Sequence, residues 1–303
     1  MLDVCLLGTG GMMPLPGRWL TACIMRSAGT TILIDCGEGT QITLRQQGWS
    51  FKGIDALLIT HYHGDHVSGL PGLMLTIGNA GRTEPLHMYG PKGLTRIVKG
   101  LLQIAPELPF DIVFHELGNG EEPFNVGCFQ ITPFKLDHGI PCLGYRVDLL
   151  RLAEFLPEKA RENNVPLKLW SRLQKGETVE QDGIVYMPEL VLGEARRGLS
   201  VCYCTDTRPV PGIVEAAKEV DLFICEGMYG EEEKKSRAND YKHMTFREAA
   251  ELAKAANVKE LWLTHFTPSM MHPKDTLPEA REVFANSYAG KDRMTKVLNY
   301  DEE

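Results

Sequence analysis

The chain has 303 residues, of which 43% are hydrophobic and 24% are charged, and its formal net charge is −8. This composition is that of a globular protein with a sizeable core. The negative charge argues against a general polyanion-binding protein. A local basic patch or bound cations could still hold a nucleic acid. No apolar run approaches the ~18 residues of a membrane span, and the first residues lack a leader pattern, so we expect a cytoplasmic protein with no membrane partner.

Short β-rich segments alternate with helical stretches along the chain, without low-complexity linkers or internal repeats. Apolar, β-branched runs predict strands and amphipathic runs predict helices. Thr245 followed by Glu248 predicts a capping box at the start of one helix. The predicted strands lie within residues 3–8, 30–37, 57–60, 85–90, 129–138, 199–206, 221–227 and 260–265, and the two clearest helices within residues 211–220 and 245–256.

Eight cysteines lie mostly inside apolar, strand-like segments and form no CxxC pair. This pattern is unlike that of a disulfide-rich secreted protein or a cysteine-ligated zinc module. We therefore predict buried free thiols.

The segment LLITHYHGDHVSGL, residues 57–70, ends a predicted strand with a group of ionisable side chains, His61, His63, Asp65 and His66. The His-x-His alternation at a strand end directs two imidazole rings to the same side. Neutral imidazole is the commonest protein ligand for zinc, and carboxylate oxygen can join it. The spacing therefore predicts a metal site, whereas a surface loop would need none of these residues.

Three further candidate ligands, His138, Asp206 and His265, each stand where a predicted strand runs out into a loop. Loops at one end of a sheet sandwich can bring together residues that are far apart in sequence, and rigid strands hold them in place. We expect these side chains to join the HYHGDH group. The remaining histidines outside this scheme lack such neighbours and are predicted to be structural or surface residues: His87, His115 and His272.

HYHGDH, with the later His138, Asp206 and His265, resembles the metallo-β-lactamase superfamily, whose fold is an α/β four-layer αββα sandwich with its metals at one edge. Further segments are similar to the ribonuclease Z subgroup, the tRNA 3′-processing endonucleases. These segments are LLGTGG at 6–11, LIDCGEGTQ at 33–41, THYHGDHVSGLPGL at 60–73, LDHGIPCLGYR at 136–146, CTDTRP at 204–209 and KHMTFREAAELAK at 242–254. The resemblance implies one domain over residues 1–303 and an endoribonuclease that removes 3′ trailers from precursor tRNA.

The resemblance also implies two Zn²⁺ ions per chain, which the sequence does not distinguish from Mn²⁺. A shared carboxylate offsets the repulsion between two close divalent ions, and such sites suit phosphodiester hydrolysis. Asp35 is expected to support the ligand histidines from outside the metal site. The implied ligands are His61, His63 and His138 for one ion and Asp65, His66 and His265 for the other, with Asp206 bridging them.

Asp65, His243 and Glu226 are the catalytic residues that the resemblance implies. In the family pattern Glu226 lies near His243, where it would keep the imidazole protonated and aimed at the leaving oxygen. The alternative is that His243 only caps the helix that begins at residue 245.

The chain departs from the family pattern in two places. A predicted arm-like insertion near residues 148–185 lacks the glycine- and proline-rich tip that grips tRNA, and the arginine that commonly follows the last metal-binding histidine is missing. Within the insertion, Lys168, Arg172 and Lys175 predict a basic helical stripe beside Leu169 and Leu173. This stripe either contacts RNA phosphates or is an ordinary solvated face.

The sequence is compatible with three functions. The first is processing of precursor tRNA, by family precedent as a homodimer in which each arm serves the partner's site. The second is hydrolysis of smaller phosphodiesters, which the acidic charge and the altered arm favour. The third is a non-catalytic metal-binding scaffold, which the presence of every ligand and of the His/Glu pair argues against.

Overall fold

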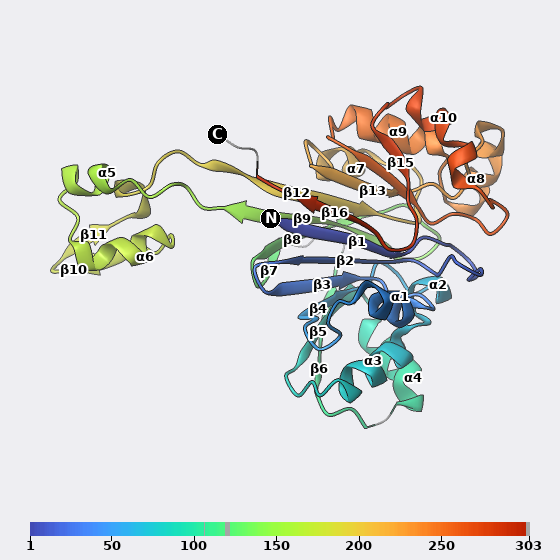
Figure 1. The fold of residues 1–303 in the computed structure, drawn as a ribbon, viewed down its shortest axis with the longest axis horizontal. Helices are drawn as coiled ribbons and strands as arrows, with labels where there is room; N and C mark the ends of the chain where they lie inside the picture. Colours follow the sequence, from blue (N-terminus) through green and yellow to red (C-terminus); the bar gives the residue numbers. More distant parts are fainter. Residues whose placement is uncertain (106, 119–121, 301–303) are drawn as a thin grey trace.

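A computed structural model describes residues 1–105, 107–118 and 122–300. Two seven-stranded sheets face each other, and helices cover the outer face of each sheet (Figure 1). The layers therefore run helix, sheet, sheet, helix, and the predicted four-layer αββα sandwich is confirmed.

The first sheet contains, in spatial order, β16 (Met294–Leu298), β1 (Leu2–Gly8), β2 (Ala22–Ser27), β3 (Thr30–Ile34), β4 (Ala56–Leu58), β5 (Leu86–Pro91) and β6 (Ile112–Leu117). The strands from β16 to β3 pair antiparallel, whereas β3, β4, β5 and β6 run parallel. The second sheet contains, in spatial order, β15 (Ser287–Ala289), β14 (Leu261–Thr264), β13 (Leu222–Glu226), β12 (Arg196–Cys204), β9 (Leu143–Arg151), β8 (Phe129–Lys135) and β7 (Phe124–Val126). Its strands β12 to β15 run parallel, and β9 is antiparallel to both β8 and β12.

Helices pack on both outer faces of the sandwich. Those next to the first sheet are α1 (Thr40–Gln47), α2 (Gly64–Val67), α3 (Leu70–Asn79) and α4 (Leu94–Leu101), and those next to the second sheet are α7 (Pro211–Ala216), α8 (Lys235–Tyr241), α9 (Phe246–Ala255) and α10 (Leu277–Arg281). The described residues also form short 3₁₀ helices, which are η1 (Leu102–Ile104), η2 (Leu167–Leu169), η3 (Pro188–Leu190), η4 (Glu232–Lys234) and η5 (Pro273–Asp275). Helix α9 begins with the predicted capping box, because Thr245 and Glu248 each bond the other's backbone N–H.

Three apolar clusters hold the layers together. Along β1, Val4 and Leu6 face the core between the sheets, while Cys5 and Leu7 face the core beneath α1 and α3. Both faces are buried from Val4 to Leu7, so this part of the strand is a continuous apolar run and not an alternation of apolar and polar residues. A third cluster packs α7, α9 and α10 on the second sheet.

The eight cysteines are all free, and seven of them are buried within these layers. Burial disfavours the thiolate and raises the pKa of Cys5 to about 12. The prediction of buried free thiols is confirmed. None of the helices in the described part of the chain has the length and apolar character needed to cross a bilayer.

The segment between β9 and β12 extends away from the sandwich (Figure 1). It carries α5 (Pro157–Glu162), α6 (Trp170–Gln174) and the two-stranded hairpin of β10 (Val179–Gln181) and β11 (Ile184–Tyr186). A small apolar cluster of its own, which includes Leu169 and Leu173, fixes these pieces together. Residues 148–151, which we expected to open the insertion, belong to β9, and the extension runs on to residue 195. We call residues 152–195 the extension.

Candidate metal centre

The strand directions bring the candidate ligands to one edge of the sandwich. In the first sheet, the parallel strands β3 and β4 end just before Asp35 and Thr60. In the second sheet, the parallel strands β12, β13 and β14 end at or just before Asp206, Glu226 and His265. Because the carboxyl ends of parallel strands meet at the same edge, residues almost 200 positions apart become neighbours.

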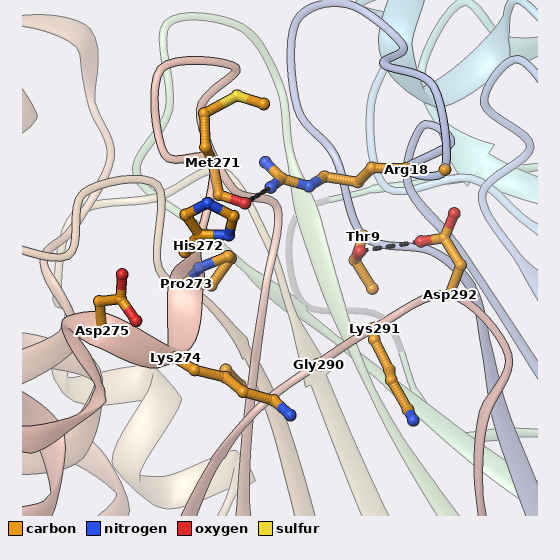
Figure 2. Close-up of a pocket in the computed structure, with 12 residues that line it drawn as sticks. Thr9, Arg18, Met271, His272, Pro273, Lys274, Asp275, Gly290, Lys291 and Asp292 are labelled. Atoms are coloured by element: carbon orange, nitrogen blue, oxygen red, sulfur yellow. Dashed lines mark hydrogen bonds between the residues drawn. The ribbon is translucent and has the colours of Figure 1, made fainter.

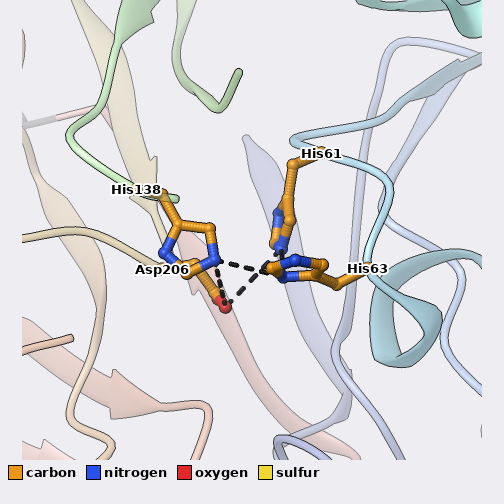
Figure 3. A group of neighbouring side chains, drawn as sticks. All are labelled: His61, His63, His138 and Asp206. Carbon is orange, nitrogen blue, oxygen red and sulfur yellow. Dashed lines mark hydrogen bonds and ion pairs between the residues drawn. The ribbon is translucent and has the colours of Figure 1, made fainter. Parts of the chain in front are cut away.

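A first group of side chains converges from both sheets (Figure 3). His63 Nδ1 lies 3.1 Å from His61 Nε2 and 3.1 Å from His138 Nε2. Oδ2 of Asp206 lies 3.6 Å from His61 Nε2 and 3.8 Å from His138 Nε2. Four donor atoms therefore surround one point.

A second group lies directly beside the first and consists of Asp65, His66 and His265. His265 Nε2 lies 3.2 Å from His66 Nε2 and 3.3 Å from Asp65 Oδ2. The other oxygen of Asp206, Oδ1, lies 3.2 Å from both of these histidine Nε2 atoms. Each carboxylate oxygen of Asp206 thus faces a different group of ligands.

The donor set fits divalent cations. A tetrahedral zinc site with Zn–N distances near 2.0–2.1 Å separates its ligand nitrogens by about 3.3 Å, close to the spacings found here. Burial lowers the pKa of His61 well below its usual range and also lowers the pKa of His138. Both shifts favour the neutral imidazole, which is the form that offers a lone pair to a metal. We conclude that these His and Asp clusters can bind metal.

Three residues at this edge have left-handed backbone conformations that side chains other than glycine rarely adopt. The φ angles are +58° at Asp35, +43° at Asp206 and +59° at His265. Each follows a strand of the parallel ladders. Asp206 and His265 turn their side chains into the centre, and Asp35 turns its side chain toward the outer nitrogen of His66. Such conformations cost about 1–3 kcal/mol each and gather at functional sites.

Asp35 supports the ligands from behind, as expected. Its fully buried carboxylate accepts hydrogen bonds from the backbone N–H of Thr60 at 2.8 Å and from the Thr60 hydroxyl at 2.9 Å. Its Oδ2 also lies 2.8 Å from His66 Nδ1. A carboxylate on the outer nitrogen fixes the ring so that His66 Nε2 faces the centre.

His243 and Glu226 form a buried pair at the side of the centre. His243 Nδ1 lies 3.1 Å from Glu226 Oε2, and its backbone N–H donates to the carbonyl of Ala238 at 2.9 Å. Burial opposes the charged imidazolium, but the Glu226 carboxylate, helped by Asp206 and Asp65, outweighs burial and raises the pKa of His243 to about 9. Thr245, and not His243, is the N-cap residue of α9, which removes the capping alternative.

Two supporting contacts had no signal in the sequence. The backbone N–H of Met12 donates to Asp65 Oδ2 at 2.7 Å. Arg18 donates to the carbonyls of Met270 at 2.7 Å and Met271 at 3.0 Å, which ties the loop after His265 to the β1–β2 loop (Figure 2). The sequence does not reveal the hydrogen-bond partner of a loop arginine or a loop backbone N–H, because the partner lies on another loop that only the folded structure brings close.

The predicted basic residues of the extension lie far from this edge and are exposed (Figure 1). They do not share one helix, because Lys168 lies in η2, Arg172 in α6 and Lys175 just beyond its end. Arg172 also pairs with Glu177 at 2.8 Å. Among the described residues, the histidines predicted to be structural or surface residues take no part in a metal-binding group: His87, His115 and His272.

Comparison with known proteins identifies the family. The model of the anti-Pycsar protein Apyc1 family matches residues 2–104, and that of the β-lactamase superfamily domain matches residues 188–266. Ribonuclease Z of Agathobacter rectalis is 57% identical over 303 residues, which cover 100% of both chains. The chain belongs to the ribonuclease Z family. Ribonuclease Z of Lachnoclostridium phytofermentans is also 57% identical, over 301 residues and 99% of each chain.

Solved structures agree with this membership. The human tRNase Z, short form, superposes with a TM-score of 0.72 at 27% identity and covers 98% of this chain and 99% of its own. A metallo-β-lactamase-fold protein of Bacillus subtilis, at 20% identity, has a TM-score of 0.69 over 97% of this chain and 98% of its own, and supports the fold alone. The predicted membership of the metallo-β-lactamase superfamily and of its ribonuclease Z subgroup is confirmed.

Proposed function

We propose that this protein is a metal-dependent endoribonuclease that removes the 3′ trailer from precursor tRNA. The observation that carries the proposal is the Asp206 carboxylate, whose two oxygens face two adjacent groups of His and Asp ligands. The full-length ribonuclease Z relatives and the human tRNase Z fold support hydrolysis of tRNA as the reaction.

We propose two Zn²⁺ ions per chain, although Mn²⁺ also suits such a centre. Asp206 would be a ligand that the two ions share. When bound, two divalent ions lower the pKa of a water molecule and offset the charge that develops on the phosphoryl oxygens. The ligands would be His61, His63 and His138 on one side and Asp65, His66 and His265 on the other.

The protein's own groups would then place and move protons. His243, held through Nδ1 by Glu226, lines the cavity that the ligands also line, and its Nε2 is left free of the Glu226 contact. A protonated imidazole in this position is suited to donate to the leaving ribose oxygen. Asp65, fixed by the Met12 N–H, is suited to orient the attacking water as well as to bind metal.

The two alternatives have less support. Hydrolysis of small phosphodiesters as the main activity is not favoured, because relatives 57% identical over the whole chain are ribonucleases Z. A non-catalytic scaffold would have lost a ligand or the proton donor, yet every ligand converges and the His243–Glu226 pair is intact.

We further propose that residues 1–303 form one domain in which the extension is an arm, and that the protein works in the cytoplasm as a homodimer. The projection of residues 152–195 from the sandwich supports an arm that reaches beyond its own chain (Figure 1). Exposed apolar side chains on and beside it, such as Leu167 at 75% and Ile184 at 55%, support a contact surface.

Two substrates test the proposal. The zinc-loaded protein should cut a precursor tRNA at the base of its 3′ trailer and should hydrolyse bis(p-nitrophenyl) phosphate much more slowly. Sequencing of the RNA ends locates the cut, and removal of metal by a chelator should abolish both activities. A protein that hydrolyses the small ester and leaves precursor tRNA intact would contradict the proposal.

A further inference from the structure

Helix α8 supplies one wall of the cavity above the metal centre. The cavity has a volume of about 300 Å³, and its lining includes Tyr229, Arg237 and Tyr241. Five of the candidate metal ligands also line it: His63, Asp65, His138, Asp206 and His265. Arg237 is the one Lys or Arg among its described lining residues. Arg237 therefore brings a permanent positive charge to the cavity that the ligands line.

Arg237 differs from the basic residues around it in its partners. Lys234, Lys235 and Lys242 each pair with a carboxylate at 2.9–3.0 Å. No carboxylate in the described part of the chain pairs with Arg237. Its guanidinium carbon instead lies 6.0 Å from the ring centroid of Tyr229 and 5.7 Å from that of Tyr241. Its guanidinium therefore lies near two aromatic rings, and no carboxylate among the described residues neutralises its charge.

The fold fixes this arrangement at its base. Ala238 is fully buried against Met228 and Tyr229, which anchors α8 to the loop after β13. Arg237 and Tyr241 are four residues apart on α8 and so share one helix face. Tyr229 is only 6% exposed, whereas Tyr241 is 60% exposed. The Tyr229 ring is thus part of the packed interior, and the Tyr241 ring is accessible to a bound molecule.

These groups match the chemistry of unpaired RNA beside a cleavage point. A planar guanidinium binds phosphate through a fork of N–H donors, and an exposed aromatic ring stacks on an unpaired base. We propose that Arg237 binds an RNA phosphate next to the scissile one and that Tyr241 stacks on an adjoining unpaired base. This inference rests on the proposed ribonuclease function and assigns α8 as the element that grips the single-stranded 3′ end.

Measuring RNA binding directly tests the proposed role of Arg237 separately from catalysis. Metal-free Arg237→Ala should bind a fluorescently labelled, trailer-bearing tRNA about tenfold or more weakly than the parent, and the slope of log K against log salt should fall by about one. Arg96→Ala is the matched control, since Arg96 is an exposed arginine on α4, away from the cavity, and should change neither quantity. Arg237→Lys should restore the salt slope and only part of the affinity, because lysine keeps the charge and loses the planar fork.

The aromatic part needs its own pair of variants. Tyr241→Leu should weaken binding of the same RNA about 5- to 100-fold, as expected for a lost base stack, while Tyr241→Phe should keep it. With metal restored, Arg237→Ala and Tyr241→Leu should raise KM for precursor tRNA and leave kcat on bis(p-nitrophenyl) phosphate unchanged.

The possible results separate this inference from the function on which it rests. If the parent cuts precursor tRNA and Arg237→Ala behaves like Arg96→Ala in affinity and salt slope, the inference is overturned and the proposed function stands. Equal loss on RNA and on the small ester would also overturn it, because α8 would then support the centre and not the RNA. A parent that ignores precursor tRNA would overturn both.

Discussion

Glu226 Oε2 lies 3.1 Å from His243 Nδ1, and the Glu226 side chain is completely buried. The same carboxylate accepts hydrogen bonds from the backbone N–H groups of Thr207 at 2.6 Å and Met244 at 3.3 Å. Glu226 ends β13, so the sheet itself holds the imidazole in place. The pair therefore holds the His243 imidazole in a fixed position at the cavity.

The first prediction concerns proton donation. His243→Ala should keep the parent's metal content and lose about 10²- to 10⁴-fold in kcat on precursor tRNA, whose ribose leaving oxygen needs a proton. An activated nitrophenyl ester should lose much less, because its leaving group departs as a stable anion. The measurement is kcat of the parent and of the variant on both substrates, together with the metal content of each protein.

His272→Ala is the control for this change, because His272 is exposed and takes no part in the metal-binding groups. Glu226→Gln should resemble a milder His243→Ala. Equal losses on both substrates, or loss of metal from His243→Ala, would count against the acid role.

The second prediction concerns Asp206. Because its oxygens face both ligand groups, Asp206→Ala should weaken occupancy of both metal positions and leave little turnover. Elemental analysis after dialysis against zinc buffers measures the occupancy, and Asp111→Ala, an exposed carboxylate, is the control. A parent protein that holds at most one tightly bound divalent ion under zinc-replete conditions would refute the two-metal proposal.

The third prediction concerns Asp35, which the structure places behind His66 and not among the ligands. Asp35→Ala leaves the buried N–H of Thr60 without a partner, so the metal-free protein should lose about 1–3 kcal/mol of unfolding free energy. The loss of ring orientation should weaken zinc binding about 10- to 100-fold. Urea unfolding and competition with a zinc chelator measure the two effects.

Asp35→Asn is the informative companion, because asparagine tolerates the left-handed backbone at this position better than alanine does. It should recover part of the stability and little of the zinc affinity. Zinc affinity equal to the parent's in both variants would show that His66 is oriented without Asp35.

The fourth prediction concerns the basic residues of the extension. If Lys168, Arg172 and Lys175 contact RNA phosphates, replacing all three by Ala should raise KM for precursor tRNA and flatten its salt slope by up to about three units. The kcat on the small ester should not change. Because Arg172 is paired with Glu177, we expect it to contribute least of the three.

A double variant, Arg96→Ala with Lys99→Ala on α4, controls for a general change of surface charge. A triple variant that processes precursor tRNA as well as the parent does would mean that these residues form only a solvated face.

The sequence by itself determined the features that depend on neighbours along the chain. The HYHGDH spacing marks a metal site because, in the extended chain that follows a strand, side chains two residues apart return to the same side. The β-rich run of residues 3–8, closed by glycine, indicates a strand. Thr245 with Glu248 marks a helix start, because capping bonds span three residues.

Only the tertiary structure decided how distant segments meet. His66 Nε2 and His265 Nε2 lie 3.2 Å apart, although the residues are 199 positions apart in the chain, because the two sheets end at one edge. At the same edge, Asp206 lies between the two groups of ligands. The extension begins after β9 and continues to residue 195, since pairing between β9 and β12 sets its limits. Arg237 lines the cavity at the metal centre because α8 packs there through the buried Ala238. Long-range packing decides this contact, and the local sequence does not.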